Sequence, residues 1–274
     1  MKSIKEELTT NYSNNGFVLI HNLISSDEIK NMNSKLDSLY AKITLPDGKT
    51  PWGYGNLIDD KVFNLVLDKP ELLELLNEIV EGEYTFNHLL VNNKSKWIGP
   101  PVEWHQEFSL VDTYAAGYTE KDITKFAQIY IAIDEHKVEN GCLTVFPGSH
   151  KLGLLPHDDI IGYNLNHKKQ LPVEILSKLN EDCPSTHVLM KPGDCLVFNH
   201  LLVHGSGSNN ISTDRRAIIL QARSMDREID KTKFDLYSRF RLDFAIDYFR
   251  EKIEKLSSIN LYKDFIGYDK KNTQ

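Results

Sequence analysis

Between residues 83 and 225 the chain alternates short apolar runs with turn signals, and this alternation constrains the fold more than any other feature. The turn signals are Asn140-Gly141, Pro147-Gly148, Pro192-Gly193-Asp194 and Gly205-Ser206-Gly207. The runs predict strands over residues 84–92, 102–110, 127–134, 142–146, 187–191, 195–199 and 217–223. Short strands with no helix between most of them are typical of a sandwich or a double-sheet jelly roll.

The segments on either side of this β region carry helical patterns. Ser25, followed three residues later by Glu28, forms a capping box that predicts a helix start. Pro70 stands at the first-turn position of a second predicted helix, and an apolar stripe over residues 233–256 predicts a third, packed across the outside of one sheet. We therefore expect a single domain over residues 1–274, with a mostly helical N-terminal buttress (1–82), a β-core (83–225) and a C-terminal helical extension (226–274).

Charge and composition limit the partners of such a domain. The chain has 274 residues and a formal net charge of −7, which argues against binding nucleic acid or an anionic membrane by general electrostatics. No stretch approaches the roughly 20 apolar residues of a membrane span, and the first ten residues lack the apolar run of a signal peptide. Three cysteines are too few for a disulfide framework. We expect a cytoplasmic protein with a small-molecule partner, and the sequence leaves its oligomeric state open.

A possible metal site is the sharpest local feature of the β region. Within a strand, residues two apart point to the same face, so His105 and Glu107 would project together. A third ligand has to come from a distant strand, and His204, between an apolar run and a glycine turn, is the best candidate. Two imidazoles and one carboxylate on one face of an ion leave adjacent positions open, which suits non-haem Fe(II) oxygenases.

Two further residues fit the chemistry of such a site. Arg215 begins the apolar strand 217–223, where a buried guanidinium needs a partner, and a dicarboxylate cosubstrate would provide one through paired hydrogen bonds. In the strand 127–133, alternation places Gln128 on the face of Tyr130 and Ala132. The Gln128 amide therefore either donates a hydrogen bond to the cosubstrate or makes its hydrogen bonds within the protein at a strand edge.

Four segments, WHQE, ENGCLTVFPGSHKLG, GDCLVFNHLLVHGSG and DRRA, occur in this order along the chain. Together they resemble the phytanoyl-CoA dioxygenase family of Fe(II)- and 2-oxoglutarate-dependent oxygenases. The resemblance extends from about residue 92 to residue 221, and the strand 16–20 with the helix after it is also similar. It implies a double-stranded β-helix, the cupin-like variant of the jelly roll, and an enzyme that uses Fe(II), 2-oxoglutarate and O₂.

The resemblance also implies roles for individual residues. The implied iron ligands are His105, Glu107 and His204. The implied cosubstrate pocket contains Arg215, Ser206, Asn92 and Lys94. One position departs from the family pattern, since the family usually has aspartate where Glu107 stands. Glutamate keeps the charge and the donor oxygens but lengthens the side chain by one methylene.

The sequence defines the substrate less well than the cofactors. The candidate substrate contacts are Trp52, Tyr54, Phe108 and Arg223, each of which is alternatively a structural or surface residue. We expect hydroxylation of an unactivated C–H bond of a small metabolite with release of succinate and CO₂, while desaturation or ring closure stays open. Two alternatives remain at this stage: a non-catalytic metal-binding jelly roll, and a cupin-like metalloenzyme that does not need 2-oxoglutarate.

Overall fold

A computed structural model describes residues 4–41, 53–54, 57–97, 99–107, 120–159 and 169–225. Trp52, Phe108 and the helix predicted over residues 233–256 lie outside these ranges, and Tyr54 is described by its backbone alone. Among the described helices, none has both the length and the apolar character needed to cross a membrane.

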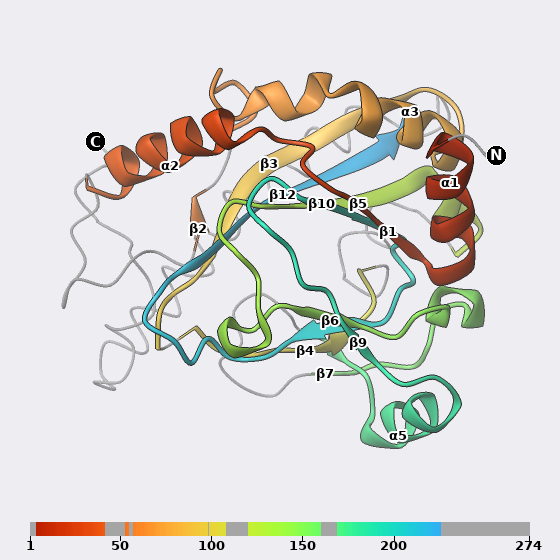
Figure 1. Cartoon of the computed structure of the whole chain (residues 1–274). Coiled ribbons are helices and arrows are strands. Elements are labelled where there is room, and N and C mark those ends of the chain that lie inside the picture. Colours follow the sequence, from red (N-terminus) through yellow and green to blue (C-terminus); the bar gives the residue numbers. More distant parts are fainter. Residues whose placement is uncertain are drawn as a thin grey trace, which may run out of the picture.

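Two antiparallel sheets form the centre of the molecule (Figure 1). The six-stranded sheet has the order β1 (Phe17–Ile20), β10 (Cys195–Phe198), β5 (Phe126–Ala132), β12 (Arg215–Ser224), β3 (Tyr84–Lys94) and β2 (Gly53–Tyr54). The four-stranded sheet has the order β4 (Val102–His105), β11 (His204–Ser206), β6 (Leu143–Val145) and β9 (Thr186–His187). A separate two-stranded pair consists of β7 (Asp158–Asp159) and β8 (Lys169–Gln170). The predicted jelly-roll core is thus confirmed.

Helices lie outside both sheets. The α-helices are α1 (Ile4–Asn15), α2 (Ser26–Tyr40), α3 (Pro70–Ile79) and α5 (Val173–Asp182). Short 3-10 segments are η2 (Asn64–Asp68), η4 (Glu120–Lys125), η5 (Val138–Asn140) and η6 (Ser149–Leu152). Figure 1 shows α2 and α3 above the six-stranded sheet and α5 on the far side of the four-stranded sheet.

The strands of the large sheet bury a different set of residues on each face. In β5, Ile129 and Ile131 pack toward the helices in the largest core cluster. Tyr130 and Ala132 face the other way, into a second cluster between the two sheets. The same alternation in β12 directs Ile218 toward the helices. The helices therefore seal one face with apolar contacts, while the opposite face lines the interior of the jelly roll.

The helix starts follow the signals in the sequence. The Ser25 hydroxyl accepts a hydrogen bond from the Glu28 backbone N–H, and the Ser25 backbone N–H donates to the Glu28 carboxylate at 2.8 Å. Pro70 occupies the first turn of α3, as expected. The Lys69 amine, 2.8 Å from the Glu28 carboxylate, links the starts of α2 and α3.

Three local features differ from the predictions. The strand expected over 102–110 ends at His105 as β4, so Glu107 follows the strand rather than lying within it. The short strand β2, which pairs with β3, was not predicted. Helix α5 was not predicted, and it forms because Leu179 and its apolar neighbours pack against Trp104 and Phe146 on the small sheet.

Candidate metal centre and its neighbouring cation pocket

The side chains of His105, Glu107 and His204 lie close together, and we call these three residues the triad. One ligand atom from each lies within 4.8 Å of the other two. The Glu107 Oε1 atom is 3.3 Å from His204 Nε2 and 3.7 Å from His105 Nε2. The two histidines are Cα partners on β4 and β11, and their ring centroids are 4.2 Å apart. Both imidazoles are buried, with exposed fractions of 1% and 4%, so this cluster is not a set of surface groups.

Backbone carbonyls fix the orientation of both imidazoles. His105 Nδ1 lies 2.7 Å from the Glu103 carbonyl oxygen, and His204 Nδ1 lies 2.9 Å from that of Leu202. A carbonyl only accepts, so each Nδ1 carries the hydrogen and each Nε2 presents a lone pair toward Glu107. This is the tautomer that a histidine needs in order to bind a metal through Nε2. The residues therefore fit a divalent cation with nitrogen and oxygen ligands.

The electrostatics of the cluster also favour a cation. Burial lowers the pKa of His105, and the nearby His204 lowers it further. Burial alone would raise the pKa of Glu107, but its close interactions with the two histidines outweigh burial and hold that pKa well below its usual range. The site thus combines an ionised carboxylate with an imidazole disposed to be neutral, both of which can bind a metal ion.

Gln106, between the two ligands of the His-x-Glu segment, is buried and makes hydrogen bonds to other parts of the chain. Its amide nitrogen donates to the carbonyls of Gly153 and Leu201, and its amide oxygen accepts from the Leu155 N–H. These three bonds join the end of β4 to two loops distant in sequence. Gln106 therefore holds in place the segment that carries His105 and Glu107.

A pair of cations lies beside this cluster. Arg215 and Lys94 are Cα partners on β12 and β3, and their exposed fractions are only 3% and 1%. The Lys94 amine donates to the Ser206 hydroxyl at 2.7 Å and also to the Gly207 carbonyl. The Arg215 guanidinium donates to the Gly141 carbonyl. Ser206 is on β11, two residues beyond His204, so the small sheet joins the two groups of residues.

No carboxylate pairs with either cation within the described part of the chain. Burial lowers the pKa of Lys94 to about 6, and the charge of Arg215 adds to the shift. The Arg215 Nε atom is buried, and within the described residues it has no hydrogen-bond partner. Two cations held this close in a buried pocket are costly unless an anion joins them. We call Arg215, Lys94 and Ser206 the cation pocket.

Two glycines and a tyrosine complete the cation pocket, and the sequence did not single them out. Gly141 has a φ of +72°, and a Cβ atom there would lie against the Gly207 carbonyl. The Arg215 guanidinium carbon lies 5.9 Å from the centroid of the Tyr130 ring. The Tyr130 hydroxyl is buried without a hydrogen-bond partner among the described residues. Strand alternation, which places Tyr130 on the face of Gln128, was the signal that could have identified it.

The other predicted cosubstrate residues lie on the interior face. Gln128 is buried and shares the face of Tyr130 on β5, as the alternation predicts. Asn92 is half-buried on β3, two residues before Lys94, and its Cα partner is Ala217. The proposed parts of Gln128 and Asn92 in the site therefore rest on the interior face they share.

A second polar group lies on the other side of the triad, toward the end of β12. The His200 ring stacks on Phe126 with 5.1 Å between ring centroids, and its Nε2 is 3.1 Å from the Gln221 amide nitrogen. Burial lowers the pKa of His200 to about 4, and the charges of Glu107 and His204 also act on it. His200 lies four residues before His204, and the family resemblance makes only His204 a ligand.

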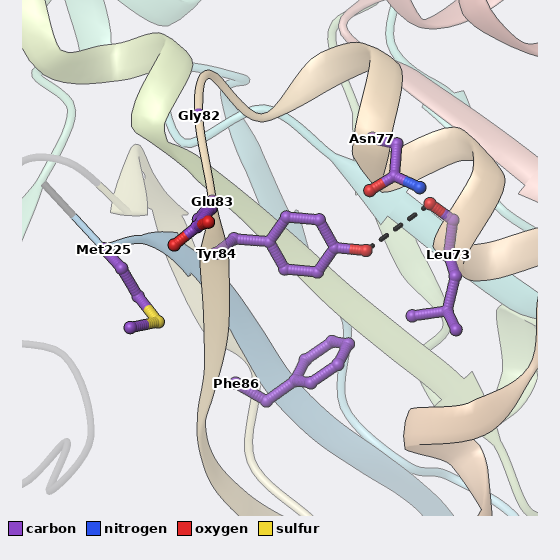
Figure 2. A pocket seen from close by; sticks show the side chains of 7 residues that line it. All are labelled: Leu73, Asn77, Gly82, Glu83, Tyr84, Phe86 and Met225. Atoms are coloured by element: carbon purple, nitrogen blue, oxygen red, sulfur yellow. Dashed lines mark hydrogen bonds between the residues drawn. The ribbon is translucent and has the colours of Figure 1, made fainter.

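A surface pocket lies elsewhere in the molecule. It is lined by Leu73, Asn77, Gly82, Glu83, Tyr84, Phe86 and Met225 (Figure 2). The Tyr84 hydroxyl donates to the Leu73 carbonyl at 3.4 Å across it. This pocket contains none of the predicted site residues.

A jelly roll with two buried imidazoles and one carboxylate has the architecture and ligand set of the non-haem Fe(II) oxygenases. The family model of phytanoyl-CoA dioxygenase (PhyH) matches residues 12–217, and the chain belongs to this family. It is accordingly an Fe(II)- and 2-oxoglutarate-dependent dioxygenase, as its motifs predict.

Curated relatives and solved structures agree with this assignment. The peroxisomal phytanoyl-CoA dioxygenase of Rattus norvegicus is 28% identical over 233 residues, which cover 78% of this chain and 67% of that protein. The L-proline trans-4-hydroxylase of Streptomyces griseoviridis is 23% identical and covers 76% of this chain and 82% of the relative. A crystal structure of EctD from S. alaskensis with 2-oxoglutarate and 5-hydroxyectoine has a TM-score of 0.64 at 17% identity, covering 84% of this chain and 78% of the other. At that identity the structural likeness establishes the fold.

Proposed function

We propose that this dioxygenase hydroxylates an unactivated C–H bond of a small-molecule metabolite, with His105, Glu107 and His204 as its iron ligands. The observation that supports the proposal most directly is the position of the cation pocket beside the triad. Arg215 and Lys94 are buried, close together and without a carboxylate partner among the described residues. A dicarboxylate that reaches from the metal to these cations would satisfy both.

The bound metal, 2-oxoglutarate and O₂ supply the oxidising chemistry, in which one oxygen atom enters the substrate and 2-oxoglutarate is converted to succinate and CO₂. The protein's contribution is positioning and electrostatics. The Glu103 and Leu202 carbonyls hold the Nδ1 hydrogens of His105 and His204, so both Nε2 atoms stay available as ligands. The carboxylate of Glu107 supplies one negative charge.

In this proposal the cation pocket binds the far carboxylate of 2-oxoglutarate. The Arg215 guanidinium offers paired N–H donors, and its charge is buried, where an ion pair is less screened than at the surface. Lys94 adds a second cation, and Ser206 adds a hydroxyl that already accepts from Lys94. Gln128 and Asn92, on the same interior face, are the proposed amide donors along the rest of the cosubstrate.

The names of the relatives support a small-molecule substrate. One relative is named a phytanoyl-CoA dioxygenase and another an L-proline trans-4-hydroxylase. The net charge of −7 disfavours nucleic acid as a partner. Among the residues proposed from the sequence as substrate contacts, Trp52, Tyr54 and Phe108 have no described side chain, whereas Arg223 is buried within β12.

The test begins with anaerobic protein loaded with Fe(II), to which 2-oxoglutarate is added. We expect a weak visible charge-transfer band, which Glu107→Ala abolishes through loss of metal and Arg215→Ala weakens through loss of cosubstrate affinity. Glu103→Ala is the matched control, because Glu103 contacts His105 through its backbone carbonyl. Admission of O₂ should then yield succinate and a hydroxylated product from a panel of amino acids, amines and organic acids.

The same experiment separates the alternatives. A metal-binding protein without catalysis would bind Fe(II) and consume no O₂ with any member of the panel. A metalloenzyme that does not need 2-oxoglutarate would stay active in Arg215→Ala. Product mass distinguishes hydroxylation, which adds one oxygen atom, from desaturation or ring closure, each of which removes two hydrogens.

A further inference from the structure

Two of the three triad residues lie at the end of β4, which is an edge strand of the four-stranded sheet. His105 is the last residue of β4 and is paired with His204 on β11. Glu107 lies two residues beyond the end of the strand, so the register of the sheet does not extend to it. Other contacts must therefore hold the segment that brings the Glu107 carboxylate to the two imidazoles.

The outer edge of β4 shows one of these contacts. The Trp104 carbonyl accepts a hydrogen bond from the Leu171 N–H at 2.8 Å. Backbone groups two residues apart lie on the same edge of a strand, and the Gln106 N–H, two residues after Trp104, donates to the Nε2 atom of His157 at 3.2 Å. The His157 imidazole therefore takes the place that the backbone of a neighbouring strand would occupy if β4 continued past its last residue.

The tautomer of His157 suits this contact. Its Nδ1 atom lies 2.7 Å from the Leu155 carbonyl oxygen, which can only accept, so Nδ1 carries the hydrogen. The Nε2 atom then has a lone pair that accepts from the Gln106 N–H. Leu155 is also joined to Gln106 directly, because its N–H donates to the Gln106 amide oxygen at 2.8 Å. The loop that carries Leu155 and His157 is thus hydrogen-bonded to both the backbone and the side chain of Gln106.

We propose that His157 is a positioning residue of the metal centre, which holds the Gln106 peptide so that the Glu107 carboxylate reaches the metal. This inference rests on the proposed function, because it takes His105, Glu107 and His204 as the ligands. A glutamate side chain has one more rotatable bond than an aspartate and therefore loses more conformational freedom when its carboxylate is fixed. A backbone held at the preceding residue leaves only the Glu107 side-chain torsions to be ordered by the metal.

The test compares variants by their binding of Co(II), whose visible d–d bands report the ligands around the ion. His157→Phe keeps a ring but removes the acceptor, whereas His157→Gln keeps an acceptor at about the position of Nε2. The matched control is His150→Phe. His150 is also half-buried, but its Nε2 atom lies 3.2 Å from the Ser13 carbonyl oxygen rather than against Gln106.

We expect His157→Phe to raise the Kd for Co(II) about tenfold or more, as is usual when a group that orients a metal ligand is removed. Its d–d spectrum should shift toward that of Glu107→Ala, which defines the site without its carboxylate. His157→Gln should restore most of the affinity and the original spectrum. His150→Phe should keep both even if it lowers the melting temperature, because a loss of stability alone does not change the ligands of the ion.

Three outcomes would overturn the inference. These are a His157→Phe protein with the Kd and the spectrum of the unaltered protein, a His150→Phe protein that shifts both as much, and a folded His157→Gln protein that behaves like His157→Phe. If His157→Phe does not fold, His157→Ala is compared with His150→Ala in the same way. Absence of Co(II) binding by the unaltered protein, or a spectrum that Glu107→Ala leaves unchanged, would instead contradict the proposed function, so the two failures are distinguishable.

Discussion

The two sides of the triad differ in the charge of their polar groups and in what holds those groups in place. In the cation pocket, Lys94 is held by the Ser206 hydroxyl and Gly207 carbonyl, and Arg215 by the Gly141 carbonyl. On the other side, His200 is held by one amide and one aromatic ring, and its Nδ1 is left over within the described residues. The comparison indicates that backbone carbonyls help to position the charged groups on the cosubstrate side, whereas side chains position the neutral His200 ring on the other side.

The largest effect is expected from a substitution in the triad, because the triad lies between the two sides. His204→Ala removes one of the two Nε2 ligands and leaves Glu107 with His105 alone beside it. We expect turnover to fall below about one-hundredth of the original rate, because metal affinity is lost. Metal content measured after gel filtration checks this. His187→Ala, on exposed β9 of the same sheet, should keep its metal.

A large but more selective effect is expected in the cation pocket. Arg215→Met removes the guanidinium and should raise the Kd for 2-oxoglutarate by about 100-fold, since hydrogen bonds to charged groups are worth about 1.5–3 kcal/mol each. Titration of the charge-transfer band measures this Kd. Fe(II) binding should stay within a few-fold of the original. An unchanged Kd for 2-oxoglutarate would mean that Arg215 does not bind the cosubstrate.

A smaller effect is expected from a substitution that disturbs the backbone of the cation pocket. Gly141→Ala places a methyl group at a positive φ and against the Gly207 carbonyl, which should cost about 1–3 kcal/mol of unfolding free energy. Because the Gly141 carbonyl accepts from Arg215, we also expect weaker 2-oxoglutarate binding. Urea unfolding and the band titration check the two parts. Gly82→Ala, at a positive φ but with the added Cβ at ordinary contact distance from the Ser224 hydroxyl, is the control for backbone strain alone.

The smallest effect is a proton linkage at Lys94. Its pKa of about 6 leaves the amine mostly neutral above that pH, whereas a bound carboxylate favours the charged ammonium. Binding of 2-oxoglutarate should therefore take up a proton at pH 7.5 to 8.5, and the uptake should fall toward zero below about pH 6 as the amine becomes charged beforehand. Anaerobic calorimetry in buffers of different ionisation enthalpy measures it. Lys94→Met should abolish the uptake, and persistence in that variant would assign the proton to another group.

The sequence was sufficient to predict the jelly roll and the members of the triad. Alternating apolar runs and glycine turns encode the strands locally, and the capping box at Ser25 encodes a helix start. The resemblance implied that His105 and His204 act together, and the pairing of β4 with β11 brings them together. The prediction of a strand through Glu107 was wrong, because β4 ends at His105.

The surroundings of the triad could not be predicted in the same way. The stacking of His200 on Phe126, the approach of Gly141 to Gly207 and the burial of Lys94 all join segments far apart in the chain. No local spacing rule encodes such contacts, because they depend on sheet register. Helix α5 was not predicted for a related reason. Its apolar side chains pack on the small sheet, and this contact is not encoded in the local sequence.

The most direct test of the account is a spectrum of anaerobic protein with Fe(II) and 2-oxoglutarate, recorded for the unaltered chain and for Glu107→Ala. We predict a visible charge-transfer band in the first, saturating at one 2-oxoglutarate per chain, and none in the second. A fully metallated unaltered protein that shows no such band, or a Glu107→Ala protein whose band is undiminished, would contradict the assignment of the metal centre.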